Sequence, residues 1–192
     1  MTLLRILEYA HDLLKNTISK GDIVIDGTCG NGHDTAFLAQ LVGSEGFVYG
    51  FDLQSQAITN TSSRVAQHGM DNRVELFHTS HSNLNKLIAE EHKGKIQGAI
   101  YNLGYLPGSD KTVITTPEET VSSLQQLIEL LNHGGMAVVV VYHGHPGGEE
   151  EKHAVVSFAE SLNQTHYEVL KYQFINQQNS PPFILAIEKK PE

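Results

Sequence analysis

The apolar residues of this chain change their spacing several times, and each change marks the boundary of a predicted element. Between residues 2 and 16, leucine, isoleucine and alanine recur at helical spacing, which predicts an amphipathic helix packed over a sheet. Beyond it, short β-branched or aromatic runs of strand length alternate with longer helical stretches. Strands are predicted at 22–26, 46–52, 74–78, 96–101, 135–142, 167–174 and 183–188, and helices at 34–42, 55–68, 82–92, 117–131 and 149–163.

Individual residues support several of these boundaries. Gly69 follows the helix at 55–68 in the manner of a glycine C-cap. Thr116 is placed as an N-cap, with Pro117 in the first turn of the next helix. The uninterrupted valines at 138–141 indicate a strand that is buried on both faces.

Strands and helices that alternate with short connections predict an α/β fold with a doubly wound parallel sheet and helices on both faces. The last two strands have only a polar turn between them, which contains Pro181 and Pro182 and predicts an antiparallel C-terminal hairpin. We therefore expect a seven-stranded, mostly parallel sheet. A length of 192 residues suits one well-buried domain, here 1–192, and is short for two.

The most informative segment is 23–35, where a β-forming run passes through Asp26 into a glycine-rich turn and then a helix. Glycines lack a Cβ, so a backbone rich in them can approach a ligand closely. The next strand ends at Asp52, where an acidic side chain can accept hydrogen bonds from ribose hydroxyls. The two features predict a nucleoside-containing cofactor at the carboxyl ends of the strands. The glycines of the turn are Gly27, Gly30 and Gly32.

The spacing in this turn distinguishes between cofactors. A dinucleotide fingerprint runs G-x-G-x-x-G and holds pyrophosphate at a helix N-terminus. Here the order is Asp26-x-Thr28-x-Gly30-x-Gly32, and the acid suits a ligand with a cationic amino-acid portion. The arrangement resembles motif I of the class I S-adenosylmethionine-dependent methyltransferases, with Thr28 in place of the usual first glycine. That resemblance implies a Rossmann-like fold ending in a hairpin, with Asp26 and the loop facing the methionine part and Asp52 holding the ribose. An ordinary glycine-rich turn in another α/β protein is the alternative.

The resemblance extends the cofactor site to the loop after the third strand. Many methyltransferases of this class have an Asp there that bonds the adenine amino group, whereas this chain has Ser80 and His81. Ser80 could instead cap the next helix. The predicted cofactor-binding residues are Asp26, Thr28, Gly30, Asn31, Gly32, His33, Asp34, Thr35, Asp52, Leu53, Gln54, Ser80, His81 and Asn102.

The loop after the fourth strand carries a second set of candidates. Its sequence, Asn102-Leu103-Gly104-Tyr105, resembles the Asn-Pro-Pro-Tyr loop of amino-group methyltransferases. In those enzymes the Asn accepts hydrogen bonds from the target nitrogen and the aromatic residue stacks on the base. A β-turn built on Asn and Gly is the alternative.

The loop after the fifth strand, 142–148, combines Tyr142, two histidines and three glycines. His143 or His145 could take a proton from an ammonium substrate, because histidine titrates near neutrality. No Cys or carboxylate stands at zinc-ligand spacing beside them, so we predict no metal. The glutamates at 149–151 could interact with the dipole of the helix they open, or one could meet a cationic amine. The other scattered histidines, His11 among them, receive no predicted role.

Composition narrows the range of partners. The net charge is −9 and the 13 Lys and Arg residues are scattered, which disfavours phosphate-driven binding to long nucleic acid but allows a short RNA read through its bases. The single cysteine, Cys29, precludes an internal disulfide and is compatible with a reducing compartment. Without a membrane-length apolar run or a secretory apolar region, we expect a cytoplasmic protein with no membrane partner. The apolar N-terminal helix could serve a homodimer interface as readily as a core.

Five segments together resemble one small bacterial family, once labelled putative rRNA methylases and now associated with tRNA wobble-uridine modification. These segments are 26–35, 51–54, 102–108, 115–117 and 142–148. The resemblance implies methylation of 5-aminomethyl-2-thiouridine at wobble position 34, with the tRNA anticodon stem-loop as partner. Asn102 would position the amine, and Tyr105 or Tyr142 would stack on the base.

Three other functions stay open at this point. The chain could be a methyltransferase that acts on rRNA or on a small-molecule amine. It could also be a non-enzymatic regulator that binds S-adenosylmethionine, although the polar loops at Asn102 and His143 argue against a pure binder. A nucleotide-dependent oxidoreductase is disfavoured by the glycine spacing.

Overall fold

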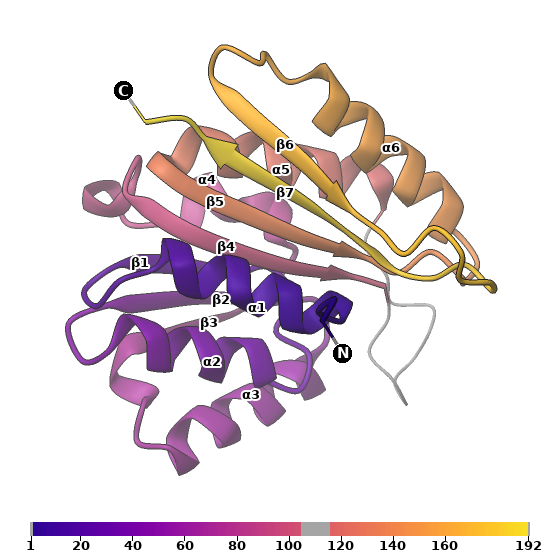
Figure 1. Cartoon of the computed structure of the whole chain (residues 1–192). Helices are drawn as coiled ribbons and strands as arrows, with labels where there is room; N and C mark the ends of the chain where they lie inside the picture. Colours follow the sequence, from indigo (N-terminus) through magenta and orange to yellow (C-terminus); the bar gives the residue numbers. More distant parts are fainter. Residues whose placement is uncertain (1, 105–115, 192) are drawn as a thin grey trace.

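The computed structural model describes residues 2–104 and 116–191, in which the strands form one seven-stranded sheet of order β3-β2-β1-β4-β5-β7-β6. Neighbouring strands are parallel except that β7 runs antiparallel to both β5 and β6. The mostly parallel sheet with a C-terminal antiparallel hairpin is thereby confirmed (Figure 1). The strands are β1 (Ile23–Asp26), β2 (Phe47–Asp52), β3 (Val74–His78), β4 (Ile96–Leu103), β5 (Leu131–Val141), β6 (Tyr167–Tyr172) and β7 (Phe183–Lys189).

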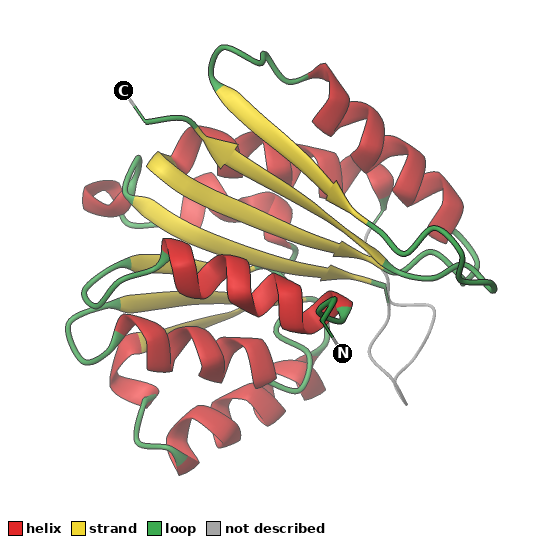
Figure 2. Cartoon of the chain, in the orientation of Figure 1, coloured by secondary structure: helices red, strands yellow, loops and turns green. Residues whose placement is uncertain are grey.

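Helices cover both faces of the sheet, as predicted (Figures 1 and 2). The first three helices lie on one face and the last three on the other (Figure 1). The α-helices are α1 (Ile6–Thr17), α2 (His33–Val42), α3 (Ser55–Gln67), α4 (Leu84–Leu87), α5 (Pro117–Leu130) and α6 (Gly148–Ser161), and single 3₁₀ turns occur at η1 (Asp71–Arg73), η2 (His81–Asn83) and η3 (Glu90–His92). Among the described residues, no helix is both long and apolar enough to span a bilayer.

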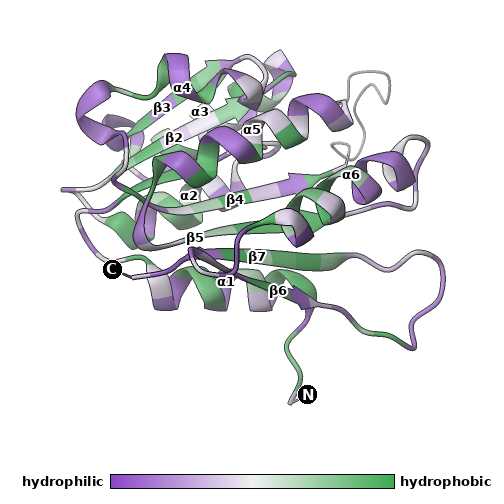
Figure 3. Cartoon of the chain, turned by 90° about the horizontal axis from the view of Figure 1, so that it is seen from above, coloured by the Kyte–Doolittle hydropathy of each residue, from purple (hydrophilic) through white to green (hydrophobic). Residues whose placement is uncertain are grey.

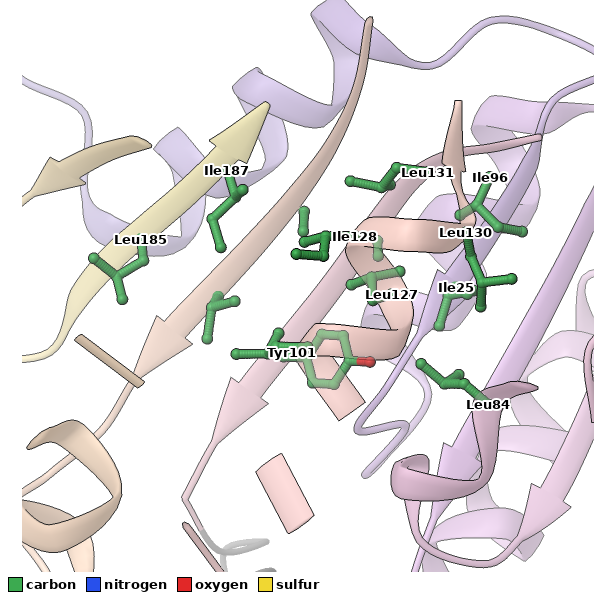
Figure 4. Packing of buried hydrophobic residues seen from close by; sticks show 14 of the residues in the cluster. Ile25, Leu84, Ile96, Tyr101, Leu127, Ile128, Leu130, Leu131, Leu185 and Ile187 are labelled. Atoms are coloured by element: carbon green, nitrogen blue, oxygen red, sulfur yellow. The ribbon is translucent and has the colours of Figure 1, made fainter. Parts of the chain in front are cut away.

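Side chains of the central strands alternate between two cores, because successive residues of a strand point to opposite faces. In β1, Val24 belongs to the core beneath α1 and α2, while Ile25 belongs to the core beneath α5 and α6. Tyr101 and Leu127 lie in this second core (Figure 4). The valines at 138–141 of β5 are buried, as predicted, and β5 and β7 are hydrophobic over most of their length (Figure 3).

The predicted caps are present. The Thr116 hydroxyl accepts a hydrogen bond from the Glu119 backbone N–H, and the Glu119 carboxylate accepts one from Thr116 N, which completes a capping box ahead of Pro117. Gly69 follows α3 with φ of +63°, the left-handed conformation expected of a glycine C-cap.

One predicted element is wrong. The helix expected at 82–92 is instead a 3₁₀ turn, the four-residue α4 and a second 3₁₀ turn. Ile88 leaves the helix in an extended conformation and is buried in the core. The next backbone N–H, of Ala89, donates to the Tyr49 hydroxyl instead of to a helical carbonyl. Burial of Ile88 thus overrides the local helical preference.

Several boundaries also differ from the prediction. The first helix begins at Ile6 instead of residue 2, and β5 begins at Leu131, whose buried side chain pairs with Ile96 of β4. Strand β4 continues to Leu103, so Asn102 is the second-last residue of the strand and does not lie in the following loop. A residue on a strand is held more rigidly than a loop residue, which matters for the site below.

Candidate active site

The described residues enclose a cavity of about 800 Å³ at the carboxyl ends of β1, β2, β4 and β5. Strand order reverses between β1 and β4, and an open α/β sheet binds its ligands in the crevice at such a point. Residues from the glycine-rich loop, from the ends of these strands and from α1 line the cavity. The site therefore lies where the sequence predicted it.

Asp26 is fully buried under the glycine-rich loop and is not among the residues that line the cavity. Its carboxylate accepts hydrogen bonds from the Thr28 backbone N–H at 3.1 Å and from the Thr35 hydroxyl at 2.6 Å. Burial, and after it the charge of Asp34, raises the pKa of Asp26 to about 7. In this structure Asp26 and Thr35 shape the loop, and a direct contact with a ligand stays a prediction for both.

Asp52 ties the same loop to the end of β2. Its carboxylate accepts hydrogen bonds from the backbone N–H groups of Gly30 and Gln54, each at 2.9 Å. Burial raises the pKa of Asp52. Each carboxylate oxygen keeps a second lone pair, so Asp52 can still accept hydrogen bonds from hydroxyls in the cavity that it lines.

Two glycines of the loop are needed for packing within the fold. A Cβ on Gly27 would lie 2.5 Å from the ring of Tyr101. A Cβ on Gly32 would lie 2.7 Å from the Cα of Thr61 on α3, and Gly32 also has φ of +77°. Gly32 lies outside the cavity lining, so its small size serves the approach of α2 to α3.

His81 is only 2% exposed and lines the cavity, yet neither ring nitrogen has a hydrogen-bond partner among the described residues. Burial lowers the pKa of His81 to about 4, so the ring is neutral near pH 7 and offers one donor and one acceptor. A buried polar group of this kind requires a partner, which a ligand in the cavity would provide. The Ser80 hydroxyl accepts a hydrogen bond from Ser82 N and so caps η2, as the capping alternative predicted.

Asp34, at the start of α2, joins two other side chains in the cavity wall. Its carboxylate accepts a hydrogen bond from Asn102 Nδ2 at 2.6 Å, and its other oxygen lies 2.7 Å from Nε2 of His11. Because a carboxylate only accepts, the amide nitrogen of Asn102 must face Asp34. Among the described residues, Asn102 Oδ1 has no hydrogen-bond donor, so it can accept from a ligand. The Asn102 backbone N–H donates to the Thr28 hydroxyl at 2.7 Å, which fixes the strand end as well.

His11 is a site residue that the sequence did not reveal. It lines the cavity with Leu7, one turn earlier on α1, and its ring stacks on Phe37 with centroids 4.0 Å apart. The pair at i and i+4 on one face of a helix was visible in the sequence. Nothing in the sequence, however, shows that α1 lies over the carboxyl ends of the strands.

The two histidines after β5 hold their loop in place. His143 Nδ1 lies 2.5 Å from Glu149 Oε1, and His143 Nε2 lies 3.1 Å from the Pro181 carbonyl oxygen. Each ring nitrogen of His143 therefore already faces an oxygen atom of the protein. The ring nitrogens of His145 lie 2.8 Å and 3.0 Å from the carbonyl oxygens of Tyr142 and Pro146. These contacts argue against the predicted role of either histidine as proton acceptor.

The glutamates at 149–151 are partly engaged in the fold. Hydrogen bonds from His143 and then Lys152 lower the pKa of Glu149. Glu151 is buried and accepts a hydrogen bond from the Thr120 hydroxyl at 2.7 Å. Neither Glu149 nor Glu151 lines the cavity, so the structure does not support a contact of either residue with a substrate amine.

The structure places most of the predicted site residues around one cavity. Tyr142 lines it and is 36% exposed, and burial, followed by the charge of Asp34, raises the pKa of its hydroxyl. Tyr105 lies outside the described residues. No cluster of three or more metal-binding side chains occurs in the described ranges. The predicted residues that line the cavity are Thr28, Gly30, Asn31, His33, Asp34, Asp52, Leu53, Gln54, His81, Asn102, Tyr142, His143 and His145, and those that do not are Asp26, Gly32, Thr35 and Ser80.

Comparison with known proteins agrees with this geometry. The family model described as "Putative rRNA methylase" matches residues 48–188. The chloroplastic tRNA (mnm⁵s²U34)-methyltransferase of Arabidopsis thaliana is 37% identical over 191 residues, which are 95% of this chain and 69% of that protein.

Two crystal structures are similar over nearly their whole length. The putative rRNA methylase from Clostridium thermocellum is 42% identical with a TM-score of 0.94, over 98% of this chain and 100% of that one. A putative methyltransferase from Streptococcus mutans, in complex with SAH, is 39% identical with a TM-score of 0.88, over 98% and 99% of the two chains. The chain therefore belongs to the putative rRNA methylase family and is a class I S-adenosylmethionine-dependent methyltransferase.

Proposed function

We propose that this protein transfers a methyl group from S-adenosylmethionine to the amino group of 5-aminomethyl-2-thiouridine at tRNA wobble position 34. The product is 5-methylaminomethyl-2-thiouridine. The observation that carries this proposal is the hydrogen bond from Asn102 Nδ2 to Asp34, because it leaves an amide oxygen in the cavity wall to accept from an amine. The name of the Arabidopsis relative supports the choice of substrate.

The cavity fits the cofactor. A volume of about 800 Å³ is within the range of small-molecule sites. Neutral His81 offers the donor and acceptor that the Watson–Crick edge of adenine requires, and Asp52 can accept from the ribose hydroxyls. Bound there, S-adenosylmethionine supplies a methyl group on a positively charged sulfur.

The methyl acceptor must be a neutral amine, since an alkylammonium ion has no lone pair with which to attack. Asn102 Oδ1 would accept one N–H of the amine and so direct its lone pair toward the methyl carbon. The amine lone pair then forms the N–C bond while the C–S bond breaks with its electron pair going to sulfur. The products are a secondary ammonium and S-adenosylhomocysteine.

An acidic protein can bind an anticodon loop through bases instead of phosphates. Tyr142 is partly exposed at the cavity and could stack on the wobble base. Stacking of a base on an aromatic ring is sequence-tolerant and needs no basic surface. The net charge of −9 favours one other substrate, a small-molecule amine that would use the same Asn102. The description of the family favours rRNA.

The test combines the purified protein, S-adenosylmethionine and tRNA that carries 5-aminomethyl-2-thiouridine, with nucleoside mass spectrometry as the readout. We expect one added methyl on that nucleoside. The same tRNA with unmodified uridine at position 34, and rRNA, should gain none because they lack the aliphatic aminomethyl group. Absence of methylation in the presence of confirmed SAH binding would contradict the substrate and leave the methyltransferase class in place.

A further inference from the structure

We infer that His11 of α1 is the catalytic residue that takes the proton from the ammonium group of the substrate. The inference rests on the proposed function in one respect, namely that the methyl acceptor is an aliphatic amine. Such an amine is protonated near neutral pH, with an ordinary pKa of about 10. Some group in the cavity must therefore accept a proton before methyl transfer.

The hydrogen bond between His11 and Asp34 prepares the imidazole for this role. Nε2 lies 2.7 Å from Asp34 Oδ1, and a carboxylate only accepts, so Nε2 carries the hydrogen and the neutral ring keeps its lone pair on Nδ1. No hydrogen bond to Nδ1 is present among the described residues. Stacking on Phe37 fixes the plane of the ring. A base oriented by a third group in this way is the usual arrangement of an activated acid–base pair.

The same carboxylate places the base beside the residue that holds the amine. Asp34 contacts His11 through Oδ1 and Asn102 through Oδ2, and all three side chains line the cavity. In the proton transfer, the N–H bond of the ammonium breaks and its electron pair stays on nitrogen. The proton goes to Nδ1 of His11, and the resulting imidazolium is stabilised by the Asp34 carboxylate. The side chain is 30% exposed, so the proton can then pass to solvent.

Three other titratable groups that line the cavity are less suited. Both nitrogens of His143 and of His145 already contact oxygen acceptors. Tyr142 keeps its proton because burial, and after it the charge of Asp34, raises the pKa of its hydroxyl. Asp34 from α2 is the charged group that contacts the His11 ring, and the Lys15 ammonium lies 5.9 Å from the centroid of Phe37, on which the ring stacks. Glu8 and Asp12, also on α1, are exposed.

The test compares the wild type with His11→Gln in single-turnover methylation of the modified tRNA between pH 6.5 and 9.5. We expect a loss of about 10²-fold at pH 7, the lower end of the range for general-base catalysis. The loss should shrink below about tenfold near pH 9.5, since a growing fraction of the amine is then already deprotonated in solution and needs no base from the protein. His68→Gln changes an exposed histidine outside the cavity and should leave the rate unchanged at every pH.

The outcomes separate this inference from the proposed function. A wild type that methylates the tRNA, with His11→Gln reduced by the same factor at all pH values or not reduced at all, overturns the role of His11 alone. A wild type that does not methylate the amine overturns the substrate and this inference together. Affinity for SAH should stay within about threefold in His11→Gln, because the contact of His11 is to the amine side of the cavity.

Discussion

At the residue scale, Asp26 and His81 link the protonation of the site to folding in opposite directions. The pKa of Asp26 rises from 3.8 to about 7 on folding, so between these values the folded state holds a proton that the unfolded state has lost. Stability conferred by that proton is lost as the pH rises through this window. The pKa of His81 falls from 6.5 to about 4, so there the unfolded state binds the extra proton and stability is lost as the pH falls.

These opposed effects partly cancel in the wild type, and single substitutions should separate them. For the ligand-free protein, the free energy of unfolding of Asp26→Asn should rise from pH 4.5 to 7, because the His81 effect remains. That of His81→Gln should fall over the same range, and each of the two opposite trends should amount to at most roughly 3 kcal/mol. Urea unfolding at several pH values measures this. Parallel curves for the two variants would contradict the opposite shifts.

The sequence predicted a site residue where that residue directly follows a strand. Asp52, His81 and Asn102 stand at or just after strand ends, and a parallel sheet brings such ends to one edge. The contacts of His143 with Glu149 and the Pro181 carbonyl were not predicted, because a helix and the hairpin turn supply these partners and no local pattern shows them.

At the element scale, the glycine-rich loop depends on how closely α2 approaches α3. Gly32 has φ of +77°, and a Cβ added to it would lie 2.7 Å from the Cα of Thr61. Helix α3 also holds Asn31 of the loop, because Arg64 of α3 donates a hydrogen bond to the Asn31 carbonyl at 2.7 Å. Separation of the two helices would therefore disturb the cofactor side of the cavity.

Gly32→Ala tests this, with Gly69→Ala as the matched control. Gly69 has φ of +63° and open space around a Cβ, so its replacement should cost only the left-handed strain, about 1 kcal/mol. Gly32→Ala should cost about 1–3 kcal/mol more through overpacking and should also weaken SAH binding. Thermal unfolding and calorimetry provide the two measurements. Equal costs for the two variants would show that the contact with Thr61 is unimportant.

Element types followed from the sequence wherever the pattern was long and regular. The strands of the sheet were all predicted, since short runs rich in β-branched and aromatic residues, bounded by turn residues, are typical of strands. The helix at 82–92 failed because the burial of Ile88 and the Tyr49 hydroxyl, both tertiary effects, interrupt it. Local periodicity does not contain that information.

At the scale of the whole molecule, the topology brings distant parts of the chain together at the carboxyl ends of the strands. Strand order reverses between β1 and β4, α1 supplies His11, and the turn before β7 supplies Ser180 and the Pro181 carbonyl. The sequence predicted the sheet but not the docking of α1 over its edge. By the proposed function, the cavity has a cofactor half, marked by Asp52 and His81, and an amine half, marked by Asn102.

The division of the cavity is the central claim, and one paired measurement tests it most directly. SAH affinity by calorimetry and single-turnover methylation of tRNA carrying 5-aminomethyl-2-thiouridine would be measured for the wild type, Asp52→Asn and Asn102→Ala. Asp52→Asn should weaken SAH binding about tenfold or more, because the ribose hydroxyls lose hydrogen bonds to a charged carboxylate. Asn102→Ala should keep SAH affinity within about threefold while the rate falls about 10²-fold. An Asn102→Ala variant that loses SAH affinity as Asp52→Asn does, or that keeps the full rate, would contradict the account.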